Sequence, residues 1–204
     1  MFEKMLKWLR SLLDRMFQED DIVISDRMSS AIELWSRMYE NGGPWCNEKS
    51  GVHGLRLPAA IASEFARLVT LEMEASITGS VRADYLQAQL IPFLDEIRNY
   101  SELACALGGI VFKPYVSNGK IVIDAVQGDC FFPTAFDSSN RMTGAIFIDQ
   151  IKRKRSIFTR AEHHEFLGGV HTIENKAFES RSSFSLGSEI ELSSVPEWAQ
   201  IQPV

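Results

Sequence analysis

The stretch GAIFIDQIKRKRSIFTRAEHHEFLGGVHTIENKAFE, residues 144–179, decides the fold class of this chain of 204 residues. Apolar and polar side chains alternate along much of it, as they do in strands that bury one face. The alternation predicts three antiparallel strands, over about residues 144–152, 157–167 and 170–179. The pair Gly168-Gly169 predicts a tight two-residue turn between the last two strands.

A further hairpin is predicted just upstream. The sequence Ser-Asn-Gly at 117–119 is a strong hairpin turn, and β-prone residues 110–116 and 120–126 flank it. After this hairpin we expect a loop that contains Pro133 and then a turn at 137–140. The second half of the chain is therefore predicted to be rich in antiparallel strands.

The first half of the chain has the spacing of helices. Apolar residues recur every three or four positions in four segments. These segments predict helices over about residues 1–18, 26–39, 58–67 and 82–107. Asp26 is a plausible N-cap, Pro92 must kink or split the fourth helix, and Gly108-Gly109 closes it.

Two segments between these helices have patterns of their own. Residues 41–54 hold four glycines and one proline and predict an exposed loop. Trp45 in this loop should be anchored, either within the chain or at a subunit contact, because a mobile tryptophan would leave a large apolar surface in water. In residues 69–77 apolar and polar side chains alternate, which predicts a half-buried strand.

Helices followed by antiparallel strands are the layout of an α+β fold. We expect three parts along the chain: an amphipathic helical arm over residues 1–20, an α+β domain over residues 21–181, and an irregular tail over residues 182–204. A final turn is predicted at residues 196–198 within the tail.

Composition narrows the class of protein. The net charge of −6 and the pI near 5.3 argue against a sequence-reading nucleic-acid module, which usually carries a basic face. No stretch reaches about eighteen uncharged apolar residues, so we expect a soluble protein with no membrane partner, and no secretory leader is recognisable. Cys46, Cys105 and Cys130 lie far apart without a CxxC pair, which favours a reducing cytoplasm and packed thiols.

One polar cluster could carry chemistry. It consists of Glu162, His163, His164, Glu165, His171 and Glu174. In the predicted hairpin, His164 lies diagonal to His171 on one face, while His163 lies opposite Glu174 on the other. A metal-dependent hydrolase centred on Glu162, His164 and His171 is the enzymatic alternative. Solvated side chains, or side chains paired across the strands, are the favoured interpretation.

Sequences that mark a nucleophile are missing. There is no GxSxG around any serine and no GxxxxGK[ST], so acyl transfer and nucleotide hydrolysis lack a scaffold. Cys130 precedes Phe131-Phe132 and is interpreted as a packing residue. The basic run at 152–155 is interpreted as a solvated turn at a hairpin tip, with a non-specific phosphate contact as the alternative. We therefore expect no enzyme and assign no catalytic, cofactor-binding or metal-binding residue.

Six stretches carry a family resemblance when they are taken in order. They are LWSRMYENGGPW at 34–45, LRLPAAIASEFARLVTLEMEASITGS at 55–80, LACALGGIVFKPYV at 103–116, DAVQGDCFFPTAFDSSNRMTGAIF at 124–147, FTRAEHHEF at 158–166 and IENKAFES at 173–180. Together these stretches resemble the portal proteins of tailed phages and prophages of Gram-positive bacteria. None of them is a catalytic motif, so the specificity comes from their joint order.

The resemblance implies a structural subunit of a ring, typically of twelve copies, at one capsid vertex of the virion. Such a ring is assembled in the host cytoplasm and serves procapsid assembly, genome packaging and ejection. Its partners would be copies of itself, major capsid and scaffolding proteins, the terminase and head-completion proteins. Double-stranded DNA would pass through the ring without sequence-specific binding.

The resemblance reaches only the wing of such a subunit, the outward α+β part. The clip, stem and crown come later in portal chains, so we expect a truncated or split gene product. The alternative within phage heads is a minor capsid or connector protein.

Overall fold

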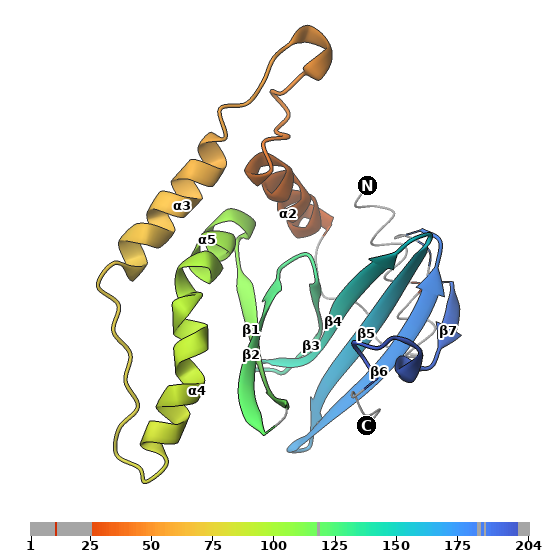
Figure 1. The fold of residues 1–204 in the computed structure, drawn as a ribbon. Coiled ribbons are helices and arrows are strands. Elements are labelled where there is room, and N and C mark those ends of the chain that lie inside the picture. The colour runs from red at the N-terminus through yellow and green to blue at the C-terminus, as the bar shows by residue number, and fades with distance from the viewer. Residues whose placement is uncertain (1–10, 12–25, 118, 183–184, 186, 200–204) are drawn as a thin grey trace. The chain divides into compact units, whose positions relative to one another are not determined.

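A computed structural model of the chain describes Ser11 and residues 26–117, 119–182, 185 and 187–199. The predicted helix over 1–18 and the predicted arm over 1–20 lie outside the described residues, apart from Ser11, which is helical. The fold is α+β, as predicted (Figure 1). None of the described helices combines the length and the apolar character needed to cross a membrane.

The chain divides into two compact units. Unit 1 comprises residues 1–29 and 130–204, and unit 2 comprises residues 30–129. Unit 2 and its boundary carry α2 (Asp26–Tyr39), the 3-10 helix η1 (Glu48–Ser50), α3 (Leu57–Thr70), α4 (Ala83–Asp95), α5 (Ile97–Leu107), β1 (Ile110–Ser117) and β2 (Lys120–Gln127). Unit 1 carries β3 (Phe131–Phe136), β4 (Met142–Arg153), β5 (Ser156–Leu167), β6 (Val170–Ser180), β7 (Ser188–Ile190) and the 3-10 helix η2 (Leu192–Ser194). The single domain predicted over 21–181 is therefore shared between two units.

In unit 2, α4 and α5 pack against the β1–β2 hairpin, and α3 packs on α5. The hairpin has the predicted turn, with Ser117 opposite Lys120. Phe93 of α4 and Tyr100 of α5 meet Phe112 of β1, with ring centroids 4.9 and 5.7 Å from that of Phe112. These three rings join α4, α5 and the hairpin into one body.

The predicted long helix over 82–107 is two helices, α4 and α5. The split falls at Glu96, four residues beyond Pro92, which stays inside α4. The N–H of Glu96 donates to the carbonyl of Phe93 at 3.2 Å, a tighter turn that ends α4. Gly108 closes α5 as predicted, in the left-handed conformation at φ 82° that glycine adopts without strain.

The strand predicted over residues 69–77 is wrong. Helix α3 continues to Thr70, and residues 71–82 form turns and irregular backbone. The side chain of Gln87 in α4 takes the place of a neighbouring strand: its Oε1 accepts from the N–H of Ile77 at 2.8 Å, and its Nε2 donates to the carbonyl of Ala75 at 3.3 Å. Alternation of apolar and polar side chains is therefore not sufficient for a strand, and no described strand pairs with residues 71–77.

The loop at 41–54 is exposed, as predicted, but it does not bury Trp45. The Trp45 side chain is 49% exposed. Its ring lies against Gly43, where an added Cβ would come within 2.5 Å of the ring. Among the described residues this contact of Trp45 lies within the loop, and an anchor at a subunit contact stays a prediction.

Unit 1 is built on one antiparallel sheet in the order β3-β4-β5-β6-β7 (Figure 1). The predicted register of the β5–β6 hairpin is confirmed, with Leu167 opposite Val170 and His163 opposite Glu174. The tip of the β4–β5 hairpin holds Lys154 at φ 51°, within the basic run predicted there. Ser139 and the other residues at 137–140 form the predicted turn.

Two predictions for unit 1 are wrong. The loop expected around Pro133 is strand β3, which tolerates a proline because it lies at the edge of the sheet beside a bulge. The tail expected to be irregular contains β7, which forms the opposite edge. After β7, the side chains of Leu192, Val195 and Trp198 pack on Ala177 of β6. The predicted turn at 196–198 is present and completes this cover, since the N–H of Trp198 donates to the carbonyl of Val195.

The two faces of the sheet differ. One face carries Ile146, Ala161 and Phe178, each at most 1% exposed. The other face is apolar where residues 192–198 cover it and again around Phe147, whose ring meets that of Phe131, and it is polar along the middle of β5. This polar stretch holds the cluster that the sequence singled out.

Candidate functional site

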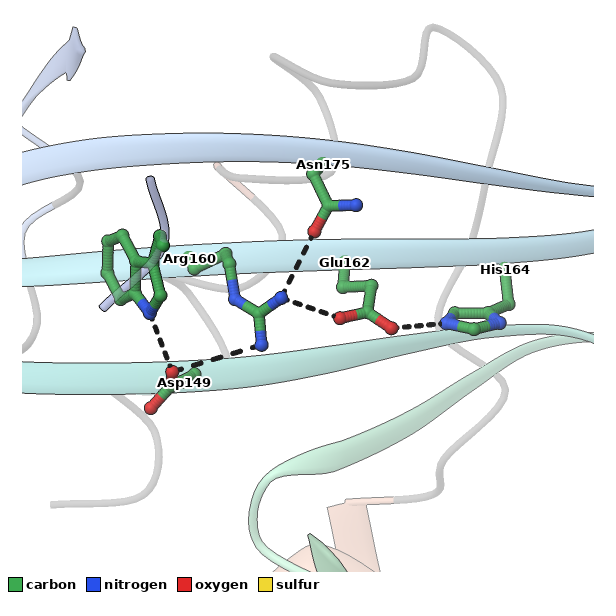
Figure 2. Close-up of polar contacts among 6 residues, drawn as sticks. Asp149, Arg160, Glu162, His164 and Asn175 are labelled. Atoms are coloured by element: carbon green, nitrogen blue, oxygen red, sulfur yellow. Dashed lines mark hydrogen bonds and ion pairs between the residues drawn. The ribbon is translucent and has the colours of Figure 1, made fainter. Parts of the chain in front are cut away.

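A polar network crosses the three central strands of the sheet in unit 1 (Figure 2). Its members are Asp149 of β4, Arg160, Glu162 and His164 of β5, His171 and Asn175 of β6, and Trp198 of the tail. The three β5 residues are spaced by two, so all three side chains leave the strand on the same face. Asp149 lies opposite Arg160, and Asn175 lies opposite Glu162, which brings their side chains to that face as well.

Arg160 is the centre of the polar network. Its Nη1 donates to Oε2 of Glu162 at 2.8 Å and to Oδ1 of Asn175 at 3.4 Å. Its Nη2 lies 3.9 Å from Oδ2 of Asp149, which also accepts from Nε1 of Trp198 at 3.0 Å. The guanidinium of Arg160 thus forms ion pairs with two carboxylates. Asp149 in addition bonds Trp198 of the tail to strand β4.

The other end of the network is a chain of histidines. Glu162 Oε1 lies 2.6 Å from Nε2 of His164, and Nδ1 of His164 lies 3.0 Å from Nε2 of His171. The ring of His164 also meets the ring of Phe147 edge to face, with centroids 5.0 Å apart. The network therefore runs from the buried Glu162 out to His171, which is exposed.

Burial makes the charges of this network costly unless they are paired. The side chains of Arg160 and Glu162 are 13% and 10% exposed. A buried ion that loses its partner destabilises the fold, whereas a buried pair by itself adds little. Nε of Arg160 is buried and has no hydrogen-bond partner among the described residues. The ion pair between Arg160 and Glu162 is thus needed so that neither buried side chain carries an unpaired charge.

The sequence cluster is divided as predicted. Glu162, His164 and His171 lie on the face of the polar network. His163 is buried on the opposite face, where Glu174 is its cross-strand neighbour. Oε1 of Glu174 forms an ion pair with Nζ of Lys176 at 3.3 Å. Four network members were missed. Arg160 and Asn175 could have been found from the β5 period and the β5–β6 register, whereas Asp149 joins through the β4 register and Trp198 through the tail.

The network has some features of an acid–base site and lacks others. A carboxylate bonded to one imidazole nitrogen is the arrangement that orients a general base. Here the second nitrogen of His164 is occupied by His171, and the seven network residues include no serine, threonine or cysteine. In the described parts of the chain, no group of three histidine, cysteine or acidic side chains is placed to share a metal ion. The geometry favours a structural bond between strands over the metal-dependent alternative.

The other predicted candidates are surface features. Within the basic run at 152–155, Arg153 bonds to the carboxylate of Glu197. The backbone N–H of Glu197 and the guanidinium of Arg153 hold the pKa of this carboxyl below its usual range. All three cysteines are free thiols: Cys46 and Cys130 are half-buried, but Cys105 is exposed where packing was expected.

Helix α3 of unit 2 presents an unusual apolar surface. Its small residues Ala62 and Ala66 are buried, on the side where the helix packs on α5. Its large apolar residues point away from this contact: Leu57, Ile61, Phe65 and Leu68 are 60, 58, 54 and 57% exposed. We call these four residues the α3 stripe. They follow one another at intervals of three and four, so they form one line along the helix.

No protein-family model matches the chain, and no curated protein or solved structure matches it significantly. The functional argument therefore depends on the residues and contacts described above.

Proposed function

We propose that the chain is a structural subunit of the portal ring of a tailed phage and contributes the wing of that ring. The observation that carries the proposal is the α3 stripe. It lies within residues 55–80, one of the stretches that resemble portal proteins, and it displays large apolar side chains where an isolated helix would display polar ones.

An assembly role gives these side chains a reason to be exposed. A helix that is apolar on nearly all sides is normally buried. Glu64 and Arg67 are the charged residues of α3, and they bond to each other at 2.6 Å along one edge of the helix. The remaining surface would be covered in a ring by neighbouring protein.

A structural role also agrees with the polar network. The side chains of Arg160 and His164 both bond to the carboxylate of Glu162, so the polar groups of these residues are directed at one another. We propose that the chain is not an enzyme and uses no cofactor. The network then holds the strands and the tail of unit 1 in register.

The remaining parts of the proposal follow from the portal resemblance. The chain would act in the virion at a capsid vertex, next to capsid, scaffolding, terminase and head-completion proteins. Its net charge of −6 suits a ring that lets DNA pass without holding it. We expect no retention of a DNA fragment at physiological salt in a gel-shift assay.

The assembly state tests the proposed function. The purified chain is examined by light scattering across a range of concentrations and by negative-stain electron microscopy. Closed rings with one repeated subunit support the portal proposal. A chain that stays monomeric at every concentration, also when it is mixed with terminase and major capsid protein, contradicts it. A minor capsid or connector protein would join capsids without forming rings by itself.

A further inference from the structure

The outer end of the polar network is a pair of histidines on neighbouring strands. His164 of β5 and His171 of β6 lie diagonal to each other on one face of the sheet, and Nδ1 of His164 lies 3.0 Å from Nε2 of His171. The side chain of His164 is 17% exposed, and His171 is exposed. The pair therefore lies where the network meets the solvent.

The hydrogen positions of this pair follow from Glu162. Its carboxylate is paired with Arg160, so it is ionised and can only accept hydrogen bonds. Nε2 of His164 therefore donates to Oε1 of Glu162, which lies 2.6 Å away (Figure 2). In the neutral imidazole this leaves the lone pair on Nδ1, the nitrogen that faces His171.

A carboxylate that accepts from one nitrogen of a histidine is the usual support of a metal-binding histidine. It fixes the tautomer, orients the ring and makes the other nitrogen a stronger ligand. The ring of Phe147 adds a second contact, since it meets the ring of His164 edge to face with centroids 5.0 Å apart. His164 thus has the orientation of a metal ligand without help from an ion.

The distance between the two facing nitrogens favours one class of ion. Nitrogen ligands lie about 2.1 Å from a divalent transition-metal ion, so two ligands at a right angle are about 3.0 Å apart and two tetrahedral ligands about 3.4 Å apart. The observed distance of 3.0 Å agrees with the right angle. Right angles belong to the square-planar and octahedral sites of Cu²⁺ and Ni²⁺, ions that imidazole binds well, rather than to tetrahedral Zn²⁺.

We propose that His164 and His171 form a two-histidine site for a divalent ion of the nickel and copper class. The ion replaces the hydrogen between the two rings and binds Nδ1 of His164 and Nε2 of His171. The displaced hydrogen of His171 moves to Nδ1 of the same ring through the solvent. Water fills the remaining positions, because two protein ligands are fewer than the three or four of catalytic and structural zinc sites. The ion therefore links two strands and is not a catalytic cofactor.

The link lies where the sheet loses one of its strands. The pairing of β4 with β5 ends at Gly144 opposite Glu165, so among the described strands residues 166–171 have β5–β6 pairing alone. His164 lies within the part that β4 supports, and His171 lies within the projecting end. An ion bound to both is expected to slow the opening of this end of the hairpin.

Titration calorimetry of the full chain with Ni²⁺, on protein purified without a histidine tag, tests the site. We expect the wild type to bind one equivalent. His171→Gln and His164→Gln should each weaken binding at least about tenfold, because each removes one of the two ligands. Since His171 is exposed, His171→Gln is expected to fold and tests the site alone if circular dichroism shows that His164→Gln does not.

Two controls remove metal-binding groups from unit 2. His53→Gln removes an exposed histidine, and Cys105→Ser removes an exposed thiol. Both variants should bind Ni²⁺ like the wild type. Saturating Ni²⁺ should also raise the urea midpoint of the wild type and slow hydrogen exchange in residues 166–171, because the ion binds the folded pair only. Neither change is expected in His171→Gln.

Three results would overturn the inference. The first is a wild type without saturable binding up to about 1 mM Ni²⁺. The second is unchanged binding in His171→Gln, which would place the ion elsewhere in the chain. The third is tighter binding of Zn²⁺ than of Ni²⁺, which would contradict the right-angled site. The inference does not depend on the portal proposal, since ring formation and metal binding are measured separately and either can fail alone.

Discussion

The sheet of unit 1 and the helix α3 of unit 2 use their large apolar side chains in opposite ways. Unit 1 buries Ile146 and Phe178 completely and folds its tail back so that Trp198 is only 2% exposed. Helix α3 buries alanines and leaves Phe65 more than half exposed. The sheet buries its central apolar side chains in folding, whereas α3 leaves its large apolar side chains at the surface.

This difference bears on the proposed assembly role of a chain whose composition is average. Apolar residues make up 45% of the sequence, a share typical of soluble globular proteins. The share alone does not reveal an interface, because the side chains are distributed unevenly between the interior and the surface. Substitutions that separate folding from association therefore test the comparison directly.

The largest effect is expected in the sheet, for Phe178→Ala. Phe178 is 1% exposed, and removing a fully buried ring destabilises a fold by about 3–5 kcal/mol. Urea denaturation followed by the fluorescence of Trp198, with the other tryptophans replaced by phenylalanine, measures the loss. Phe178→Leu is the matched control and should lose less than half as much. A loss below about 1 kcal/mol would show that the sheet does not depend on its own core.

The next effect concerns the polar network, through Arg160→Met. The change leaves the buried carboxylate of Glu162 without its cation, and breaking a largely buried pair costs about 2–4 kcal/mol. The double variant Arg160→Met with Glu162→Met should regain at least half of this loss, since the carboxylate that remains, Asp149, has a side chain that is 47% exposed. Urea denaturation of both variants and of the control Lys176→Met checks the expectation. If the single variant were as stable as the wild type, the network would not stabilise unit 1, and the proposed structural role would be wrong.

Local sequence patterns predicted much of this fold. Gly168-Gly169 and the sequence at 117–119 each specified a turn, and each turn fixed the register of its hairpin. Strand β3 was missed because Pro133 argues against a strand unless its place at a sheet edge is known. The alternation at 69–77 wrongly predicted a strand, because a strand also needs a neighbouring strand to bond to. Here the side chain of Gln87 accepts the hydrogen bond from the N–H of Ile77.

The polar network was predictable only in part. The spacing of Glu162 and His164, together with one hairpin register, was enough to place His171 beside them. Arg160 joins the same face by the same period, but its acceptor Asp149 depends on the pairing of β4 with β5. Trp198 reaches Asp149 across 49 residues of sequence, and the serine-rich tail before it has no pattern that indicates this contact.

A smaller effect, which varies with pH, is expected within unit 2 at Tyr39. Its hydroxyl donates to Oε1 of Glu102 at 2.8 Å. This bond, with burial and the charge of Glu102, raises the pKa of Tyr39 above its ordinary value of 10.0. The neutral hydroxyl is thus favoured in the folded state, so its stabilisation is complete below pH 10.0 and is lost as the pH rises from there through the folded-state pKa.

Tyr39→Phe tests this bond. The variant should lose about 1 kcal/mol at neutral pH, the usual contribution of a hydrogen bond to a charged acceptor that stays partly solvated. It should also lose the part of the alkaline destabilisation that begins at pH 10.0. Urea denaturation at several pH values measures both effects. The absorbance of tyrosinate shows whether one tyrosine, absent from the variant, ionises at higher pH than the others. An unchanged alkaline profile would mean that the Glu102 contact does not hold the Tyr39 proton.

The smallest effect on folding is expected for Phe65→Ala, which removes the same ring as Phe178→Ala from the α3 stripe. Phe65 is 54% exposed, so the variant loses only about 1 kcal/mol of apolar burial. Alanine returns about half of that amount through its higher helix propensity. Denaturation at a concentration below association should therefore show a net loss of about 0.5 kcal/mol, while association weakens severalfold. If Phe65→Ala instead destabilised the monomer as much as Phe178→Ala, the ring would be part of a core, and α3 would not be a surface kept for a partner.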